Sequence, residues 1–337
     1  MPTSAARDVA EVFFPLDERW RLTDSIYSPG MAKQMVWLSA LLPYEQAEQV
    51  FKRIGHCVIP RNTIWRQSQM HSERLRAHLV RKQDQVRVER VFLPPPGHDH
   101  WQRKGISIDG GMINIRGEGW KEVKVGTIGD IEQDTEWDAH TQEEVPAVRV
   151  RNVGYAAVLG SPEIFGPALW ALAVEKEVPQ AADTCVTADG APWIWNLTAD
   201  LFPDSVQVVD WYHGCQHLAA AAHALYPGDN QKAERRFKQW QDNLYLGEIQ
   251  AITDRLDQAD LQDHANYFYT HQRRMRYQEF CEDGYPIGSG TVESGIKQFK
   301  SRLSGPGMRW SRPGAEQMLA LRGAVMGDTF DVLWAMA

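Results

Sequence analysis

The sequence predicts an α/β protein whose sheet contains both parallel and antiparallel strands. In its central part, three strand-like segments come first. Two shorter strands follow, and a helical segment lies between these two. Helical patterns occupy the regions before and after the strands. With 337 residues, of which 43% are hydrophobic and 24% charged, the chain is long enough for one large or two modest domains and has a folded protein's composition.

Residues 1–97 are expected to form an N-terminal helical region. Segments 31–42 and 44–54 have helical character, and a third helix is expected from Asn62 or Thr63 onward, because either residue can cap it. The proline-rich segment at 94–97 is a stiff break before the strands.

Two short helices and a turn before a basic helix are compatible with a helix-turn-helix motif. In such a motif the second helix enters a groove of double-stranded DNA, and Arg61 and Arg66 are the candidate contacts. The alternative is a small helical bundle without a ligand.

The central strands are predicted from β-branched residues that alternate with polar ones. They cover residues 105–110, 120–128, 147–160, 184–190 and 205–210. This order is that of an RNase H-like fold, in which the first strand is central, the second and third lie on one side, and the fourth and fifth on the other. We expect residues 98–228 and 284–337 to form this core, and the strandless residues 229–283 to form a helical insertion. A helix starting at Ser289 or Thr291 and a final helix over 314–337 complete the chain.

Charge is distributed unevenly along the chain. The net charge is −8, yet residues 51–104 have a balance of +8 and residues 271–312 a balance of +4, whereas residues 127–147 carry seven acids and no Lys or Arg. A polyanion responds to local patches within a screening length of about 8–10 Å, so the whole-chain charge does not exclude a nucleic-acid partner. Solvated helix faces are the plainer explanation for either basic patch alone.

Two aspartates each end a predicted strand and precede glycine. Asp109 ends one strand and Asp189 another. If these strands are neighbours, the two residues lie about 4.8 Å apart, and carboxylates that close repel unless a cation lies between them. Enzymes that cleave phosphodiesters commonly bind two such cations, Mg²⁺ or Mn²⁺, through shared carboxylates. An ordinary turn explains either Asp-Gly alone.

Glu293 is the third candidate acid. It falls in the first turn of a predicted helix, where a carboxylate also favours the helix dipole. Lys297 and Lys300 follow on the same face, one and two turns further on, as expected beside a phosphate backbone.

Asp210 competes with Asp189 because it also ends a strand, but we expect it one strand further from Asp109, about 9–10 Å away. His213, Cys215 and His217 follow it, without the paired spacing of a zinc site. We expect Asp210 and His213 to support the site, with His213 hydrogen-bonded near the carboxylates.

Three segments together resemble bacterial insertion-sequence transposases of the DDE type. They are IDGGMINIRGEGWKEVKVG, TADGAPWIWNL with LFPDSVQVVDWYHGCQHL, and PIGSGTVESGIKQFKSRLSGPGMRWS. The ISKra-type group is the nearest, with a looser similarity to Mutator-like transposases. The resemblance implies an RNase H-like core with a helical insertion, and it implies Asp109, Asp189 and Glu293 as the catalytic and metal-binding acids. It also implies that the GMRW segment faces DNA, with Arg309 available to phosphate and Trp310 able to stack or simply to pack.

The expected function is metal-dependent cleavage of element ends and transfer of the 3′-hydroxyl to target DNA. Arg302 joins Lys297, Lys300 and Arg309 as a candidate contact to the DNA backbone. A catalytically silent DNA-binding relative and an RNase H-like nuclease are the alternatives. Unpaired cysteines and the lack of a leader or membrane-spanning segment favour a bacterial cytoplasmic protein. Joining two DNA ends further suggests a homo-oligomer.

Overall fold

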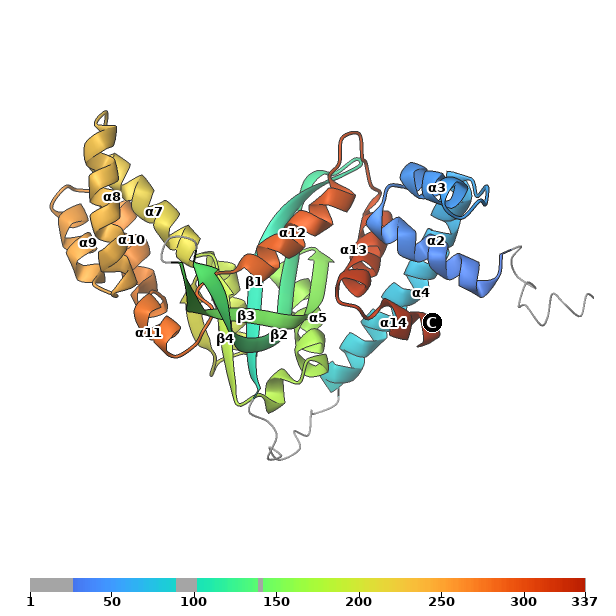
Figure 1. The fold of residues 1–337 in the computed structure, drawn as a ribbon, viewed down its shortest axis with the longest axis horizontal. Coiled ribbons are helices and arrows are strands. Elements are labelled where there is room, and N and C mark those ends of the chain that lie inside the picture. The colour runs from blue at the N-terminus through green and yellow to red at the C-terminus, as the bar shows by residue number, and fades with distance from the viewer. Residues whose placement is uncertain (1–26, 89–101, 139–141, 337) are drawn as a thin grey trace, which may run out of the picture. The chain divides into compact units, whose positions relative to one another are not determined.

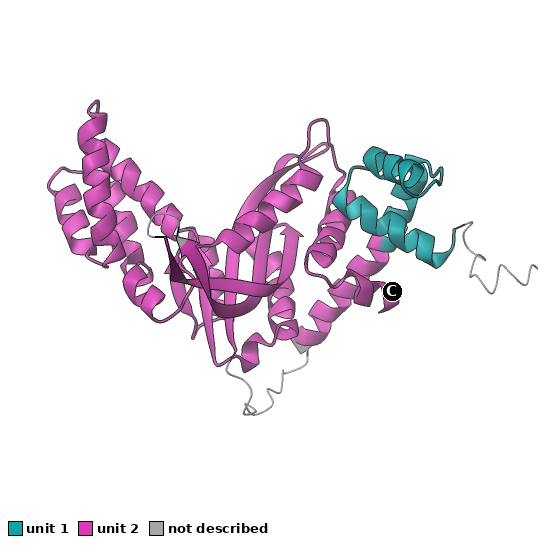
Figure 2. Ribbon diagram, viewed as in Figure 1, with its two compact units in different colours: residues 1–71 teal, residues 72–337 magenta. Residues whose placement is uncertain are grey.

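The structure, a computed structural model, describes residues 27–88, 102–138 and 142–336. Contacts divide the chain into two compact units, residues 1–71 and 72–337 (Figure 2). The division falls inside a long helix and not at the proline-rich segment 94–97, which lies outside the described residues. The domain boundaries expected from the sequence therefore stay a prediction.

The first unit is helical, as expected. It contains α2 (Pro29–Leu41), α3 (Tyr44–Arg53) and the beginning of α4 (Arg61–Val88). Ser28 caps α2, since its hydroxyl accepts a hydrogen bond from the backbone N–H of Met31 at 3.3 Å. The helices pack around a small apolar core formed by Met35, Ala47, Phe51, Ile59 and Ile64. Arg61 and Arg66 are exposed on α4.

The second unit is built on a five-stranded mixed sheet in the order β3-β2-β1-β4-β5 (Figure 1). The strands are β1 (Arg103–Ile115), β2 (Gly119–Asp138), β3 (Glu143–Leu159), β4 (Asp183–Ala188) and β5 (Val206–Val209). β1, β2 and β3 pair in antiparallel fashion, whereas β4 is parallel to both β1 and β5. The α/β class with a mixed sheet is thus confirmed, and the strand order is compatible with an RNase H-like fold.

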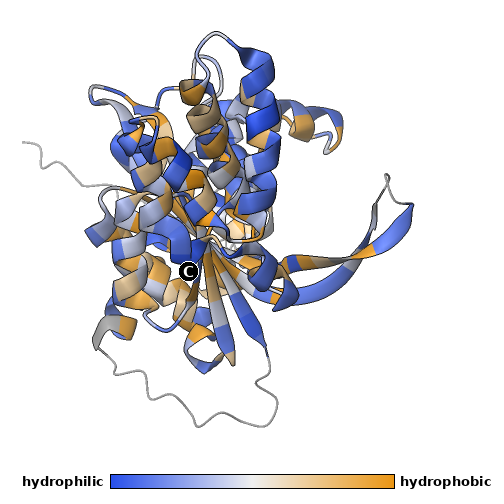
Figure 3. Ribbon diagram, turned by 90° about the vertical axis from the view of Figure 1, so that its left-hand side faces the viewer, coloured by the Kyte–Doolittle hydropathy of each residue, from blue (hydrophilic) through white to orange (hydrophobic). Residues whose placement is uncertain are grey.

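β2 is much longer than the sequence pattern predicts, and β3 begins at Glu143 and not at 147. The outer parts of the two strands pair from Asp130 opposite Arg151 to Asp138 opposite Glu143, so the acidic segment 127–147 belongs largely to a two-stranded ribbon. Figure 3 shows this outer ribbon as mainly hydrophilic. Alternating acids allow the extension, because successive residues point to opposite faces and Arg149 and Arg151 pair with acids across the ribbon.

Helices cover both faces of the sheet. α5 (Pro162–Glu175) and α6 (Pro192–Leu201) pack in the main apolar core with Ile106 and Ile108 of β1. α12 (Gly290–Leu303) lies across the other face of β1 (Figure 1). Gly111 permits this approach, because a Cβ built there would already lie 3.3 Å from the Ile296 side chain.

The stretch between β5 and α12 is helical. α7 (Trp211–Leu225) follows β5, and the expected insertion contains α8 (Asn230–Tyr245), α9 (Ile249–Asp257), α10 (Gln262–His271) and α11 (Tyr277–Glu282). Two short 3₁₀ turns, Val178–Gln180 and Gln272–Arg274, complete the connections. Where one final helix was expected, the chain forms α13 (Arg312–Met326) and α14 (Phe330–Met336), which are separated near Asp328, a residue with φ of 55°.

Candidate active site

Three aspartates lie at the same level of three neighbouring strands: Asp109 within β1, Asp189 directly after β4 and Asp210 directly after β5. The expectation that Asp109 ends its strand is wrong, because β1 continues through Gly110 and Gly111 to Ile115 and stays paired with β2. The parallel pairing of β1, β4 and β5 places the residues that precede Asp109, Asp189 and Asp210 side by side in register. The backbone N–H of Asp210 donates to the carbonyl oxygen of Ala188 at 2.8 Å, so the alignment continues to this level. Since neighbouring strands are spaced by about 4.8 Å, the acids gather at one edge of the sheet.

Glu293 reaches this edge from α12. Thr291, in the first turn of that helix, contacts Ser107 of β1 (3.3 Å between hydroxyl oxygens) and Thr127 of β2 (3.4 Å). These contacts attach the N-terminus of α12 to the strand that carries Asp109. Glu293 is half-buried there, and its carboxylate lies 3.7 Å from the Lys297 ammonium.

The pKa of the Asp109 carboxyl depends on the other charges of the site. Burial raises its pKa to about 6, and the carboxylates of Asp189 and Glu293 add to the increase. A hydrogen bond of 2.6 Å from the Gly110 N–H and the nearby His213 act in the opposite direction. The structure thus brings Asp109, Asp189 and Glu293 within electrostatic range of one another, together with His213.

Asp210, His213 and Glu293 form a tighter group. One potential ligand atom from each residue lies within 4.8 Å of the other two, which makes them a candidate metal-binding set. Asp210 is expected to lie too far from Asp109 to share a metal with it, and this group does not include Asp109. His213 comes close because Asp210 caps α7 and His213 is in the first turn of that helix.

Asp210 is fully buried, and protein donors already occupy both of its carboxylate oxygens. Oδ1 accepts a hydrogen bond from the His213 N–H at 2.9 Å. Oδ2 accepts from the Ser289 N–H at 2.6 Å and from its hydroxyl at 2.8 Å. A carboxylate offers about four acceptor positions, so these three bonds leave Asp210 little capacity for a metal and tie α7 to α12.

The donor set suits a hard divalent cation. Carboxylate oxygens are the ligands that Mg²⁺ and Mn²⁺ prefer. Among the residues that the structure describes, no Lys or Arg lies within ion-pair distance of Asp109 or Asp189, and Lys297 pairs only loosely with Glu293. Clustered carboxylates without a cationic side chain between them need a proton or a metal ion, as the raised pKa of Asp109 indicates.

Cys215 and His217 do not join this group. The Cys215 thiol accepts a hydrogen bond from Gln241 at 3.6 Å, and burial raises its pKa to about 11. His217 instead stacks on the Tyr267 ring, with 3.6 Å between the ring centroids. The two residues therefore point to different neighbours.

Burial corrects two residues of the expected DNA-contacting set. Arg302 is 2% exposed, and its guanidinium lies over the Trp310 ring, 5.1 Å from the centroid. Trp310 is 9% exposed and donates its indole N–H to the Leu303 carbonyl at 3.0 Å. The Arg302 side chain and the Trp310 ring both pack inside the fold, so neither faces solvent. By contrast, Lys297, Lys300 and Arg309 are exposed.

Sequence reasoning missed three residues around the acids. The sequence pattern predicts Ser289 and Thr291 only as possible helix starts, and it predicts no role for Tyr267. Ser289 lies within the Gly288-Ser289-Gly290 segment and Thr291 follows it; such a segment indicates a turn before a helix but not which residues its side chains contact. Tyr267 lies in the helical insertion, and nothing in its local spacing marks it.

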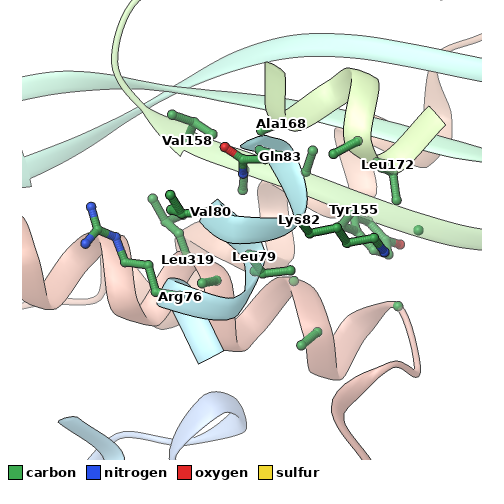
Figure 4. A pocket seen from close by; sticks show the side chains of 18 of the residues that line it. Arg76, Leu79, Val80, Lys82, Gln83, Tyr155, Val158, Ala168, Leu172 and Leu319 are labelled. Atoms are coloured by element: carbon green, nitrogen blue, oxygen red, sulfur yellow. The ribbon is translucent and has the colours of Figure 1, made fainter. Parts of the chain in front are cut away.

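A separate cavity of about 400 Å³ lies between α4, β3, α5, α13 and α14 (Figure 4). Apolar side chains line it, among them Leu79, Val80, Val158, Leu172 and Leu319. Ion pairs border it at Arg76–Glu316 (2.8 Å) and Lys82–Glu175 (2.6 Å). None of the acids of the sheet edge lines this cavity, and its borders attach the end of α4, which belongs to the second unit, to the rest of that unit.

No protein-family model and no curated protein matches the chain. Among solved structures, the chain is similar to one described as a Drosophila P element transposase strand transfer complex, with a TM-score of 0.30 and 9% identity over 94% of this chain and 86% of that chain. A likeness this weak says nothing about what the chain does. Within the described residues, no helix is long and apolar enough to cross a membrane.

Proposed function

We propose that the chain is a DDE-type DNA transposase that cleaves the ends of its element and joins the 3′-hydroxyl to target DNA. The observation that carries the proposal is the meeting of Asp109, Asp189 and Glu293, which come from β1, β4 and α12, at one edge of the sheet. The strand order and the transposase-like motifs of the sequence support it. Membership of the ISKra-type group and of the RNase H-like fold is part of the proposal.

Asp109, Asp189 and Glu293 would bind two divalent cations through their carboxylate oxygens. Bound there, Mg²⁺ or Mn²⁺ supplies positive charge that activates the attacking oxygen and stabilises the leaving one. Cleavage and joining are both in-line displacements at phosphorus, so one set of acids serves both steps. Asp210 holds the N-terminus of α12, and with it the backbone of Glu293, in place.

The exposed cations beside this site would bind the DNA backbone. Lys297 and Lys300 extend along α12 from Glu293, and Lys300 lies against Gly111, two residues beyond Asp109. Arg309 is exposed in the loop after that helix. In the first unit, Arg61 and Arg66 would bind the terminal inverted repeat. A homo-oligomer assembled on DNA in the bacterial cytoplasm completes the proposal.

The test is an assay of strand cleavage and joining on duplex DNA that carries the element ends, with Mg²⁺ or Mn²⁺. Asp109→Asn, Asp189→Asn and Glu293→Gln should each reduce both products by at least about 10³-fold, because each would remove a cation ligand. Asp204→Asn, at an exposed aspartate, is the matched control and should keep full activity.

The outcomes separate the alternatives. Cleaved ends without joined products would indicate an RNase H-like nuclease. Tight DNA binding without Mn²⁺ binding in calorimetry would indicate a catalytically silent DNA-binding protein. Full activity of any one of the three variants would remove that residue from the site.

A further inference from the structure

His213 places an imidazole beside Glu293 at the acidic edge of the sheet. One ring nitrogen of His213, one carboxylate oxygen of Glu293 and one of Asp210 all lie within 4.8 Å of one another. His213 belongs to α7 and Glu293 to α12, and both are half-buried, so solvent reaches them. His213 also lies near Asp109, since its charge acts to lower the pKa of that carboxyl. The imidazole therefore lies among the proposed catalytic acids, in a place that a dissolved ion can reach.

The backbone of His213 is held in place, whereas its imidazole is not engaged. The backbone N–H donates to Oδ1 of Asp210 at 2.9 Å, as part of the cap of α7. This bond positions the residue without using its side chain. Among the residues that the structure describes, no hydrogen bond or ion pair involves the imidazole, so its ring nitrogens are available to a ligand.

Asp210 is the member of this group that is least able to bind a cation. Hydrogen bonds from the His213 N–H and from Ser289 already occupy both of its carboxylate oxygens. Glu293 has a looser contact, with 3.7 Å between its carboxylate and the Lys297 ammonium. One nitrogen and one oxygen ligand, from His213 and Glu293, are therefore left for an ion. Ligands lie about 2.0–2.1 Å from Mg²⁺, so two ligands of one ion are up to about 4 Å apart, and a small side-chain rotation brings these two within that range.

We propose that His213 is, together with Glu293, a ligand of one of the two divalent cations at the acidic edge, and that its nitrogen makes this site favour Mn²⁺ over Mg²⁺. The inference rests on the proposed transposase function, which assigns only carboxylate ligands to the cations. Mg²⁺ prefers oxygen ligands, whereas an imidazole nitrogen is a ligand of transition metals. Asp210 is then a positioning residue, because its hydrogen bonds hold the first turn of α7, which carries His213, and the start of α12, which carries Glu293.

The test compares His213→Ala with His217→Ala in the full chain. His217 is the matched control, because it lies one turn further along α7 and stacks on the Tyr267 ring. The cap of α7 uses the backbone N–H of residue 213, so both variants keep it. Mn²⁺ is added at less than one ion per chain, with and without element-end DNA, to protein whose histidines carry ¹⁴N or ¹⁵N. Pulsed electron paramagnetic resonance then shows whether a histidine nitrogen is bonded directly to the Mn²⁺.

The wild-type protein and His217→Ala should both show a bonded nitrogen whose signal changes with the ¹⁵N label, and His213→Ala should show none. Calorimetry should give an affinity for Mn²⁺ that falls at least about tenfold in His213→Ala, because even residues that only support a metal ligand are worth about 10- to 100-fold. The affinity for Mg²⁺ should fall much less, so the preference for Mn²⁺ narrows. His217→Ala should keep both affinities.

A wild-type protein that cleaves element ends in Mn²⁺ but shows no bonded histidine nitrogen would overturn the inference and leave the transposase function standing. This outcome needs no variant, so it decides the matter even if His213→Ala fails to fold. A bonded nitrogen that persists in His213→Ala, or that is lost in His217→Ala as well, would also overturn it. Equal losses of the two affinities would overturn the preference for Mn²⁺. A wild-type protein that neither binds Mn²⁺ nor cleaves would instead overturn the proposed function, and the inference with it.

Discussion

Asp210 and Ser289, 79 residues apart in the chain, are joined by two hydrogen bonds to a single carboxylate oxygen. Oδ2 of Asp210 accepts from the Ser289 N–H at 2.6 Å and from the Ser289 hydroxyl at 2.8 Å. This pair links the end of β5 to the start of α12, four residues before Glu293. An acid that looked like a rival metal ligand is therefore built into the connection that holds Glu293 at the sheet edge.

Loss of this connection should cost stability. We expect Ser289→Ala to lower the free energy of unfolding by about 1.5–3 kcal/mol, because it removes a buried hydrogen bond to a charged group. Asp210→Asn should cost at least as much, since an amide NH₂ in place of Oδ2 would face two donors. Urea denaturation measures both. Ser301→Ala, at an exposed serine of the same helix, is the control and should stay within about 0.5 kcal/mol of wild type.

The raised pKa of Asp109 predicts a pH-dependent stability in the absence of divalent cations. Between its ordinary value of 3.8 and about 6, the folded protein binds more protons at this residue than the unfolded chain does, so Asp109 lowers stability as pH rises through this window. Asp109→Asn should remove that slope and stabilise the apo protein at pH 7 by about 1–2 kcal/mol, after allowance for solvent screening.

Thermal unfolding between pH 4 and 7.5, with Asp204→Asn as the exposed control, measures this effect. Mn²⁺ should raise the Tm of the wild-type protein at pH 7.5 and have a much smaller effect on Asp109→Asn. A parallel pH profile in wild type and Asp109→Asn would contradict the assignment of Asp109 to a crowded acidic site.

Gly190 should not tolerate a side chain. A Cβ there would meet the Tyr267 ring at 2.7 Å and the His271 imidazole at 3.2 Å, and stacked His217 prevents the Tyr267 ring from moving freely. We expect Gly190→Ala to lower the unfolding free energy by about 1–3 kcal/mol. Gly290→Ala is the control, because a Cβ there has nothing within 4 Å, and it should be neutral or slightly stabilising in its helix. Similar results for the two variants would show that the insertion does not pack closely on β4.

Lys297 offers a test of the DNA-facing side. Its side chain is 79% exposed and lies 3.7 Å from Glu293 one turn earlier in α12. We expect Lys297→Ala to reduce the slope of log Kd for element-end DNA against log salt by about 0.9, the loss of one phosphate contact. Lys238→Ala is a close match, since Lys238 is 73% exposed and lies 3.8 Å from Glu234 in the insertion. Equal slopes in all three proteins would argue against a DNA-facing Lys297.

Much of the fold could be predicted from the sequence because the signals are local. Alternating β-branched residues marked the strands, and Gly190 after Asp189 marked the end of β4. Gly110 and Gly111 after Asp109 do not end β1, which stays paired with β2 to Ile115. The order of strands and helices then restricted the topology to few choices. The limits of β2 and β3 were missed, because alternating acids read as polar and carry no apolar face until a partner strand with Arg149 and Arg151 pairs with them.

Local sequence patterns identified the candidate acids: an aspartate before Gly-Gly in one strand, aspartates after two later strands, and a glutamate at the start of a late helix. The binding of Asp210, the burial of Arg302 and Trp310, and the position of Tyr267 over Gly190 became visible in the folded structure alone. The physical reason is that periodicity and turns depend on neighbours along the chain. Burial and hydrogen bonding depend on residues that become neighbours only when the sheet register and the helix packing have formed.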